Sequence, residues 1–284
     1  MTDPTSQRFR GRRVLLTGGG SGIGLGCAAA LAAEGADVTI CGRTESKLAD
    51  AVASIGAGSR YVVADISDEE ALQHAINFAA GDEGALHAVV ANAGGTSAVG
   101  PLPLVDAAQF ERDLELNVVG TFLTIKHSAP VLARSGGGAI VAISSIAGCL
   151  THRNMGPYSA SKAALEMLVR NAADELGAWS IRVNAVRPGL VPSDASSALA
   201  DHDATRADYL AQMPLGRLGN PDDIAAAVLF FAGPDSTWVT GQVLSVDGGH
   251  SLRRGPDLSA MIGAHYERRL TDVMGPTSLA GPTS

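Results

Sequence analysis

The sequence predicts an α/β protein: a doubly wound parallel sheet of about seven strands, with helices on both faces, in a single domain. Short apolar segments alternate with longer segments of helical periodicity, which is the pattern of repeated strand–helix–strand units. Two of the apolar segments, Leu86–Ala91 and Ala139–Ile143, contain almost no polar residues, as expected for strands covered on both faces. A glycine-rich turn joins the first apolar segment to the first helical one, which favours the same fold class.

The apolar segments give the predicted strands, in chain order: Arg12–Thr17, Asp37–Cys41, Tyr61–Ala64, Leu86–Ala91, Ala139–Ile143, Ile181–Val186 and Gln242–Val246. Apolar residues spaced by three and four give the helices between them, the first of which ends before Gly35. These helices are Leu25–Glu34, Glu45–Ser54, Asp68–Ala79, Ala107–Ala133, the helix that carries Tyr158, and Asp222–Phe231.

The chain shows no internal repeat and no low-complexity linker. Residues 1–11 are expected to form a flexible arm, residues 12–250 the dinucleotide-binding catalytic domain, and residues 251–284 a C-terminal extension. The extension contains a short amphipathic stretch, Leu258–Leu270, followed by a polar tail with Gly and Pro that is expected to fray.

Composition narrows the function classes. The chain has 284 residues and a net charge of −8, with 46% hydrophobic and 18% charged residues. The acidic balance argues against a nucleic-acid partner, and no apolar run reaches the roughly 18 residues of a membrane span. The polar start of the chain lacks a signal-peptide core, and Cys27, Cys41 and Cys149 are expected to be buried free thiols. A cytoplasmic protein is expected.

The turn between the first strand and the first helix reads Thr17-Gly-Gly-Gly-Ser-Gly-Ile-Gly24. Glycines let the backbone approach a pyrophosphate at a helix N-terminus, where N–H groups and the helix dipole favour an anion. The position between strand and helix makes this turn a predicted dinucleotide site. Its predicted contacts are Gly18, Gly20, Ser21, Gly22, Ile23 and Gly24.

The end of the second strand reads Gly42-Arg43-Thr44, where NAD sites usually carry an acid. Arg43 can pair with a 2′-phosphate, so NADP(H) is favoured and NAD(H) stays possible. A solvated Arg43, or one that stacks on adenine without selecting, is the alternative. Asp65, after the third strand, is placed either to meet the adenine or as a turn residue. Thr44 and Ile66 complete this predicted contact set.

Tyr158 and Lys162 lie four residues apart in a helical segment, and therefore on one face. A free tyrosine has a pKa of about 10, and lowering it to about 7 requires about 4 kcal/mol. A nearby cation stabilises the phenolate, and a cationic cofactor ring adds to the effect. The pair predicts a general acid/base beside a charged cofactor. Taken alone, it also fits a packed tyrosine next to a solvated lysine.

Together these motifs resemble the short-chain dehydrogenase/reductases (SDRs), in the branch with Thr-Gly-x-x-x-Gly-x-Gly and Tyr-x-x-x-Lys. The resemblance covers roughly residues 11–250 and implies a Rossmann-like fold. Tyr158 lies 13 residues after Ser145, as in that family. The matching positions are Thr17–Gly24, Asp65, Asn92-Ala93-Gly94, Asn117, Ser145, Tyr158, Lys162, Pro188-Gly189 and Gly241 to Gly249.

The resemblance implies a role for each catalytic residue. Ser145 would hold the substrate oxygen, Tyr158 would give or take the hydroxyl proton, and Lys162 would bind the nicotinamide ribose and lower the pKa of Tyr158. Asn117 would help to hold a water that links Lys162 to solvent; an ordinary interior Asn is the alternative. Further cofactor contacts are implied for Asn92, Ala93, Gly94, Tyr158, Lys162, Pro188, Gly189, Val191 and Ser193.

Two positions depart from the family pattern. Ser193 stands where a threonine commonly contacts the nicotinamide amide, and Ser21 stands where some NADP-preferring members carry a basic residue. Substrate selection is expected from Cys149–Pro157 and from Ser193–Met213, which resembles a mobile lid with Tyr209 and Met213 as its bulky residues. His152 and Arg153 could meet a polar substrate group, although solvent exposure is favoured for both.

The predicted activity is the interconversion of a secondary alcohol and a ketone, or a 3-oxoacyl group, with Tyr158 as general acid/base and no metal. An enoyl thioester reductase on the same fold is one alternative, and a non-catalytic dinucleotide sensor is another. The expected partners are a small-molecule substrate and further copies of the chain, as a homotetramer or a dimer. The last strand and Asp222–Phe231 are expected at one interface.

Overall fold

The computed structural model describes residues 7–56, 58–194 and 196–275. The predicted seven strands are confirmed and form one sheet in the order β3-β2-β1-β4-β5-β6-β7, with every pair parallel. The order reverses between β1 and β4, where ligands bind in doubly wound sheets. The strands are β1 (Arg13–Thr17), β2 (Asp37–Gly42), β3 (Ser59–Val63), β4 (Ala88–Ala91), β5 (Gly138–Ile143), β6 (Ile181–Pro188) and β7 (Val243–Val246).

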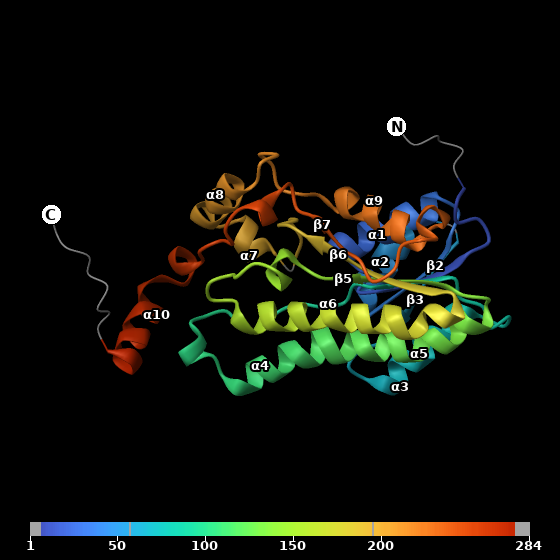
Figure 1. Ribbon diagram of the computed structural model, residues 1–284, viewed down its shortest axis with the longest axis horizontal. Helices are drawn as coiled ribbons and strands as arrows, with labels where there is room; N and C mark the ends of the chain where they lie inside the picture. Colours follow the sequence, from blue (N-terminus) through green and yellow to red (C-terminus); the bar gives the residue numbers. More distant parts are fainter. Residues whose placement is uncertain (1–6, 57, 195, 276–284) are drawn as a thin grey trace.

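Helices cover both faces of this sheet, as Figure 1 shows. Helices α1, α2 and α9 pack on one face, and α3, α5 and α6 pack on the other. The helices are α1 (Gly22–Ala33), α2 (Glu45–Ile55), α3 (Glu69–Ala80), α4 (Ala107–Leu114), α5 (Gly120–Arg134), α6 (Gly156–Leu176), α7 (Ser197–Ala200), α8 (Asp203–Gln212), α9 (Pro221–Ala232) and α10 (Ser259–Met274).

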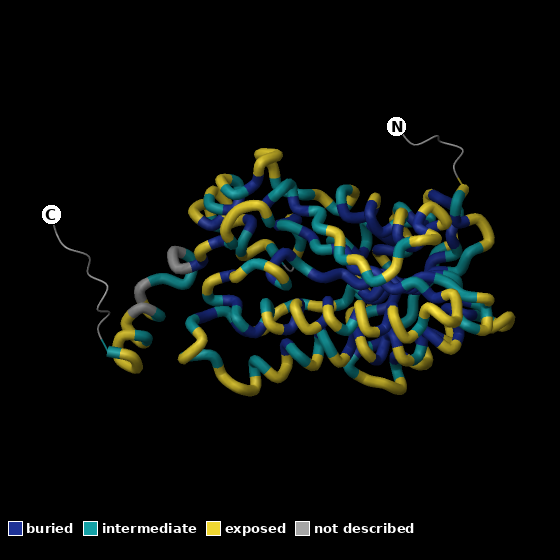
Figure 2. Tube along the Cα trace, viewed as in Figure 1, coloured by how far each residue is buried: buried dark blue, intermediate teal, exposed yellow. Residues whose placement is uncertain are grey.

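Two hydrophobic cores lie between the sheet and its helical layers. Side chains of a strand alternate between the two faces, so Leu15 of β1 belongs to one core while Val14 and Leu16 belong to the other. All three are fully buried. The buried residues run through the middle of the molecule and the exposed ones along the outer faces of the helices (Figure 2). The rigid sheet thus fixes the strand ends from which the site is built.

The predicted helix Ala107–Ala133 is present but contains a π-helical turn at Glu115–Val119, between α4 and α5. Such turns occur frequently at functional sites. Asn117 lies in this turn and is fully buried. The first helix begins at Gly22 rather than Leu25, because the glycine turn runs directly into it after the N-cap residue Ser21.

Two expectations about burial are wrong. Residues 7–11 do not form a loose arm, because Phe9 is fully buried in a core and its N–H donates to the Glu34 carbonyl at 3.0 Å. The rest of the predicted arm, residues 1–6, lies outside the described residues. Cys27 and Cys41 are buried as expected, but Cys149 is exposed because it lies in the loop after β5.

The extension after β7 packs along the loop between β5 and α6. An isolated parallel bridge joins Arg153 to Asp257, and their side chains form an ion pair of 3.2 Å. Leu258 is fully buried in a small third hydrophobic cluster with residues of the predicted lid. The predicted amphipathic stretch lies in α10, which is kinked at Gly263. The predicted tail beyond Gly275 lies outside the described residues.

Candidate active site

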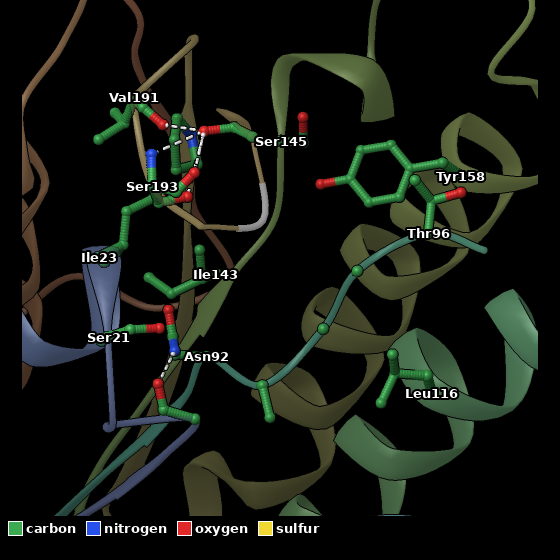
Figure 3. A pocket seen from close by; sticks show the side chains of 18 of the residues that line it. Ser21, Ile23, Asn92, Thr96, Leu116, Ile143, Ser145, Tyr158, Val191 and Ser193 are labelled. Atoms are coloured by element: carbon green, nitrogen blue, oxygen red, sulfur yellow. Dashed lines mark hydrogen bonds between the residues drawn. The ribbon is translucent and has the colours of Figure 1, made fainter. Parts of the chain in front are cut away.

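A cavity of about 600 Å³ lies at the carboxyl ends of the strands. It extends from the glycine turn, past Ser145 and Tyr158, to the lid (Figure 3). Every residue predicted to contact the cofactor lines this cavity, as do three of the four predicted catalytic residues. The fourth, Asn117, does not line it.

The glycine turn forms the first wall of the cavity, and Gly18, Gly22 and Gly24 leave no room for side chains. A Cβ at Gly24 would overlap the carbonyl oxygen of Gly18, and a Cβ at Gly22 would lie 2.8 Å from the Cβ of Ser193. Asn92 Nδ2 ties the end of β4 to the turn by donating to the carbonyls of Thr17 and Gly18, both at 3.0 Å. The turn therefore has a backbone surface with a fixed position.

The N-terminus of α1 lies in this wall of the cavity. Ser21 caps the helix without a hydrogen bond from its side chain, so the N–H groups of the first turn keep their capacity to bind an anion. These features fit the pyrophosphate of a dinucleotide, which needs close backbone approach and donor groups at one point.

Arg43 and Asp65 stand at the open end of the same cavity. Both line it, and Arg43 Nη1 lies 4.0 Å from Asp65 Oδ2. The Arg43 side chain is 72% exposed, so this surface ion pair contributes little to stability. Lys47, in the first turn of α2, also lines the cavity. This end can accept an anion.

Ser145, Tyr158 and Lys162 meet at the middle of the cavity. Ser145 follows β5, whereas Tyr158 and Lys162 lie one turn apart on α6. Lys162 Nζ donates to the carbonyl of Ile143 at 2.9 Å and lies 5.7 Å from the centre of the Tyr158 ring. In Figure 3 the hydroxyl of Ser145 and the ring of Tyr158 face the same space. The predicted face of the helix thus carries both groups towards the serine.

Burial dominates the ionisation of these groups. It lowers the pKa of Lys162 from 10.5 to about 8, against the opposing charge of Glu166. It also raises the pKa of Tyr158, an effect that a hydrogen bond from Ser145 opposes and the charge of Asp113 reinforces. The expectation that Lys162 lowers the pKa of Tyr158 is therefore not met by the protein groups alone. An acidic phenol at this site requires further positive charge.

Asn117 lies behind the cavity and not in its wall. Its Oδ1 accepts from the Gly95 N–H at 3.1 Å, and its Nδ2 donates to the carbonyls of Gly95 and Asp113 at 2.7 and 2.9 Å. A Cβ at Gly94 would touch both Asn117 Oδ1 and Lys162 Nζ, at 2.7 and 3.2 Å. The amide is thus next to Lys162 and holds the segment after β4.

A buried ion pair lies near Lys162, and its residues belong to none of the motifs described above. Glu166, one turn after Lys162 on α6, accepts from Ser144 Oγ at 2.7 Å and from Arg187 Nε at 2.8 Å. Glu166 is only 4% exposed. The pair connects α6 to β6 and to the residue before Ser145. In the sequence, the only indication of this pair is that Glu166 stands four positions after Lys162, on the same face of a helix that is half buried.

The segment after β6 closes over the glycine turn. The carbonyl of Val191 accepts a hydrogen bond of 2.6 Å from Ser196 Oγ, which in turn accepts from the N–H of Ser193 at 2.9 Å. Lys47 Nζ and Asp194 Oδ2 join this segment to α2 at 2.7 Å. Ser193 lines the cavity and places a hydroxyl at the position where a threonine commonly stands in the family.

His152 is buried, contrary to the favoured expectation, whereas Arg153 is exposed as expected. His152 is 6% exposed and lines the cavity. Tyr209 and Met213 of the lid are also buried, and Tyr209 lines the cavity. Met261 of the C-terminal extension also lines the cavity and was not predicted. The apolar face of the amphipathic stretch Leu258–Leu270 indicated that this segment packs against the domain, but not where.

The parallel sheet, the glycine turn at its switch point and the serine–tyrosine–lysine group define a pyridine-nucleotide-dependent oxidoreductase. Such enzymes interconvert a secondary alcohol and a ketone by hydride transfer. Among the described helices, none is both long and apolar enough to cross a membrane. The chain belongs to the short-chain dehydrogenase/reductase family, since residues 18–251 match a family model described as "Enoyl-(Acyl carrier protein) reductase" and a solved structure that is 44% identical is described as a short-chain type dehydrogenase/reductase.

Two relatives illustrate the range of this family. A cis-4-hydroxycyclohexanecarboxylate dehydrogenase of Sinomonas cyclohexanicum is 38% identical over 248 residues, which are 86% of this chain and 98% of the relative. A 7alpha-hydroxysteroid dehydrogenase of Escherichia coli K12 is 36% identical over 253 residues, which are 88% of this chain and 98% of the relative.

A solved structure extends the likeness beyond the family model. A short-chain type dehydrogenase/reductase from Mycobacterium ulcerans is 44% identical, has a TM-score of 0.87, and covers 96% of this chain and 99% of its own. Because that match covers 96% of the chain, it includes most of the C-terminal extension, whereas the matches to the two relatives above cover 86% and 88% of the chain.

Proposed function

We propose that this protein is an NADP(H)-preferring dehydrogenase/reductase that interconverts a secondary alcohol and a ketone, with Tyr158 as its general acid/base. One observation supports the proposal above all. A single cavity joins the dinucleotide-type glycine turn to Ser145, Tyr158 and Lys162, and continues into an apolar compartment. When bound, the nicotinamide supplies or accepts the hydride.

The protein groups orient the substrate and move the proton. Ser145 donates a hydrogen bond to the carbonyl oxygen and holds it against the hydroxyl of Tyr158. In the direction of reduction, Tyr158 donates its proton to that oxygen; in the direction of oxidation, the phenolate accepts it. Lys162, held by the Ile143 carbonyl at 2.9 Å, stabilises the phenolate. Asn117 keeps the segment Asn92–Gly95 in place next to Lys162.

The remaining predicted contacts hold the cofactor. Gly18 to Gly24 and the start of α1 take the pyrophosphate, Asn92 to Gly94 and Asp65 with Ile66 border the adenosine side, and Pro188 to Ser193 border the nicotinamide side. The backbone cradle at Gly18, Gly22 and Gly24 supports this assignment, because a Cβ at any of the three would meet another atom within 3 Å.

The preference for NADP(H) rests on Arg43 and on the lack of an acid at the end of β2. Arg43→Ala is expected to weaken NADPH binding about 10- to 100-fold, the loss of one charge-assisted contact, and NADH binding less than threefold. Fluorescence titration of both nucleotides measures this, with the exposed Arg134→Ala as the control. Equal losses for the two nucleotides would contradict the 2′-phosphate assignment.

An enoyl thioester reductase is the second candidate, and the description of the matching family model favours it. The intact Tyr158 and Lys162 argue for the ketone chemistry, because enoyl reductases of this fold tend to alter that spacing. Oxidation of NADPH, followed at 340 nm with a panel of ketones and a panel of enoyl thioesters, separates the two. Tight nucleotide binding without turnover of either panel would support a sensor instead.

A homotetramer, or a dimer as its first step, is part of the proposal. Strand β7 is an edge of the sheet, and Leu244 on this strand is 43% exposed. Phe230 on α9 and Trp238, in the segment between α9 and β7, are 38% and 99% exposed. Such an exposed apolar face next to an unpaired strand supports an interface between copies of the chain. Light scattering that finds only monomers would contradict it.

We also infer a cytoplasmic location and a boundary at residue 250 between the catalytic domain, which includes residues 7–11 because Phe9 lies in its core, and an extension at residues 251–284. Three free cysteines support a reducing compartment. The family model, which ends at residue 251, supports the boundary.

A further inference from the structure

The far end of the cavity, beyond Tyr158, is an apolar compartment. It is formed by three segments that are distant in the sequence: the loop between β5 and α6, the lid, and the C-terminal extension. These segments share a hydrophobic cluster that Tyr158 itself contacts. The side chains that line this compartment are Ile146, His152, Met155, Leu199, Tyr209 and Met261.

His152 is the one imidazole in this lining, and its orientation is fixed. Its Nδ1 lies 3.1 Å from the carbonyl oxygen of Leu150, which can only accept, so Nδ1 carries the hydrogen. The C-terminal extension holds the same edge of the ring. A Cβ at Gly255 would overlap the Thr151 carbonyl and lie 3.5 Å from Nδ1. This edge therefore belongs to the protein interior.

The opposite nitrogen, Nε2, faces a different environment. It has no hydrogen-bond partner among the described residues. The buried side-chain atoms without a partner, within the same described ranges, are Asn154 Nδ2, Ser159 Oγ and His250 Nδ1. Nε2 is not one of them, so it is accessible, and the ring lines the cavity. Burial lowers the pKa of His152 to about 4, so the imidazole is neutral at pH 7 and Nε2 is purely an acceptor.

Resting on the proposed alcohol–ketone chemistry, we propose that His152 determines substrate specificity by accepting a hydrogen bond from a donor, such as a second hydroxyl group, that lies away from the reacting carbon. The rest of the substrate is a compact apolar body, because Ile146, Met155, Leu199 and Met261 present apolar side chains around His152. A pocket acceptor of this kind discriminates against an analogue that cannot donate.

Tyr209 is the other polar group of the compartment. It is 3% exposed and contacts the His250 ring edge-on, with a centroid distance of 5.4 Å. A tyrosine hydroxyl both donates and accepts, so it would bind a hydroxyl and an ether alike. Selection of donors over ethers therefore distinguishes His152 from Tyr209.

The test uses matched pairs of ketones: hydroxy- and methoxycyclohexanones substituted at carbon 3 or 4, and the corresponding decalones. The ratio of kcat/KM for the hydroxy over the methoxy member is measured within each protein, so that a general loss of activity cancels. We expect a ratio of about 10 for at least one pair in the wild type. His152→Phe should reduce this ratio to about 1. His152→Gln keeps an acceptor and should retain part of the preference. Tyr209→Phe should leave the ratio unchanged.

Each other outcome has a definite meaning. A wild type that turns over the ketones without preferring any hydroxy member overturns the role of His152 and leaves the proposed function intact. So does a preference that survives in His152→Phe, or one that disappears in Tyr209→Phe instead. If the wild type reduces none of these ketones or a wider ketone panel, the proposed function fails, and this inference fails with it.

Discussion

The two ends of the cavity are built in different ways. The cofactor end consists of backbone at the carboxyl ends of β1, β2 and β4, where the register of a parallel sheet sets every position. The substrate end consists of side chains from loops that the sheet does not pair. These loops are held by contacts among themselves, such as Arg153 with Asp257 and Arg254 with Asp208. Substitutions in the glycine turn should therefore disturb the first end, and substitutions of the loop side chains the second.

This difference separates nucleotide binding from substrate selection. The catalytic residues lie at the boundary, since Lys162 is hydrogen-bonded to β5 while Tyr158 contacts the cluster under the lid. A variant of one end should leave the other end measurable. The predictions below test that separation in order of decreasing effect.

At the boundary, Tyr158→Phe is expected to lower kcat by about a thousandfold, because the variant lacks the hydroxyl that exchanges the proton with the substrate oxygen. Nucleotide binding should change less than threefold, since the ring is kept. Steady-state rates and a fluorescence titration with NADPH measure the two effects, and Tyr61→Phe, which is not in the lining of the cavity, is the control. Turnover that survives in Tyr158→Phe would remove this residue from the mechanism.

At the substrate end, the burial of His152 should make the free energy of unfolding depend on pH. Its pKa is about 4 in the folded protein and about 6.5 in the unfolded chain, so the unfolded chain binds more protons between these values. The free energy of unfolding should therefore fall as the pH drops from 6.5 towards 4, by up to about 3 kcal/mol from this group.

Urea denaturation of the wild type and of His152→Phe, at pH 7 and at pH 4.5, isolates the contribution of this imidazole. His250, whose pKa is also lowered by burial, and the acidic side chains are present in both proteins. The wild type should lose more stability than the variant on acidification. An equal loss in the two proteins would mean that the ring is solvated, as the sequence alone suggested.

At the cofactor end, Gly24→Ala is expected to weaken nucleotide binding at least tenfold. The new Cβ would overlap the Gly18 carbonyl and lie 2.6 Å from Asn92 Nδ2, which forces the turn open. Gly177→Ala is the matched control, because a Cβ there meets no atom within 4 Å and the backbone is helical. Unchanged nucleotide affinity in Gly24→Ala would place the pyrophosphate elsewhere.

The smallest effect is expected from Met261→Ala, which enlarges the substrate compartment. The ratio of kcat/KM for a decalone over cyclohexanone should rise about threefold, since the removal of apolar volume makes room for the larger ring. Met274→Ala, at the exposed end of the same helix, should leave the ratio as it is. A change in nucleotide affinity in Met261→Ala would contradict the separation of the two ends.

The same division explains what could be predicted from the sequence. Seven strands and the glycine turn follow from local patterns, because strand periodicity and turn chemistry act over a few residues. Tyr158 and Lys162 were placed correctly, since a helix carries residues i and i+4 on one face.

The burial of His152, the ion pair of Glu166 with Arg187, and the contribution of Met261 were not predictable in that way. Each depends on which segments meet in three dimensions, and neither periodicity nor spacing contains that information. The exposure of Cys149 has the same origin, because a small thiol among small residues looks alike in a core and in a loop.

The C-terminal extension supplies one wall of the compartment, and it follows every strand of the sheet in the chain. The segments that form the nucleotide site, from the glycine turn to Ser193, all precede it. Because synthesis runs from the N-terminus, translation produces every segment of the nucleotide site before it produces this wall of the substrate compartment.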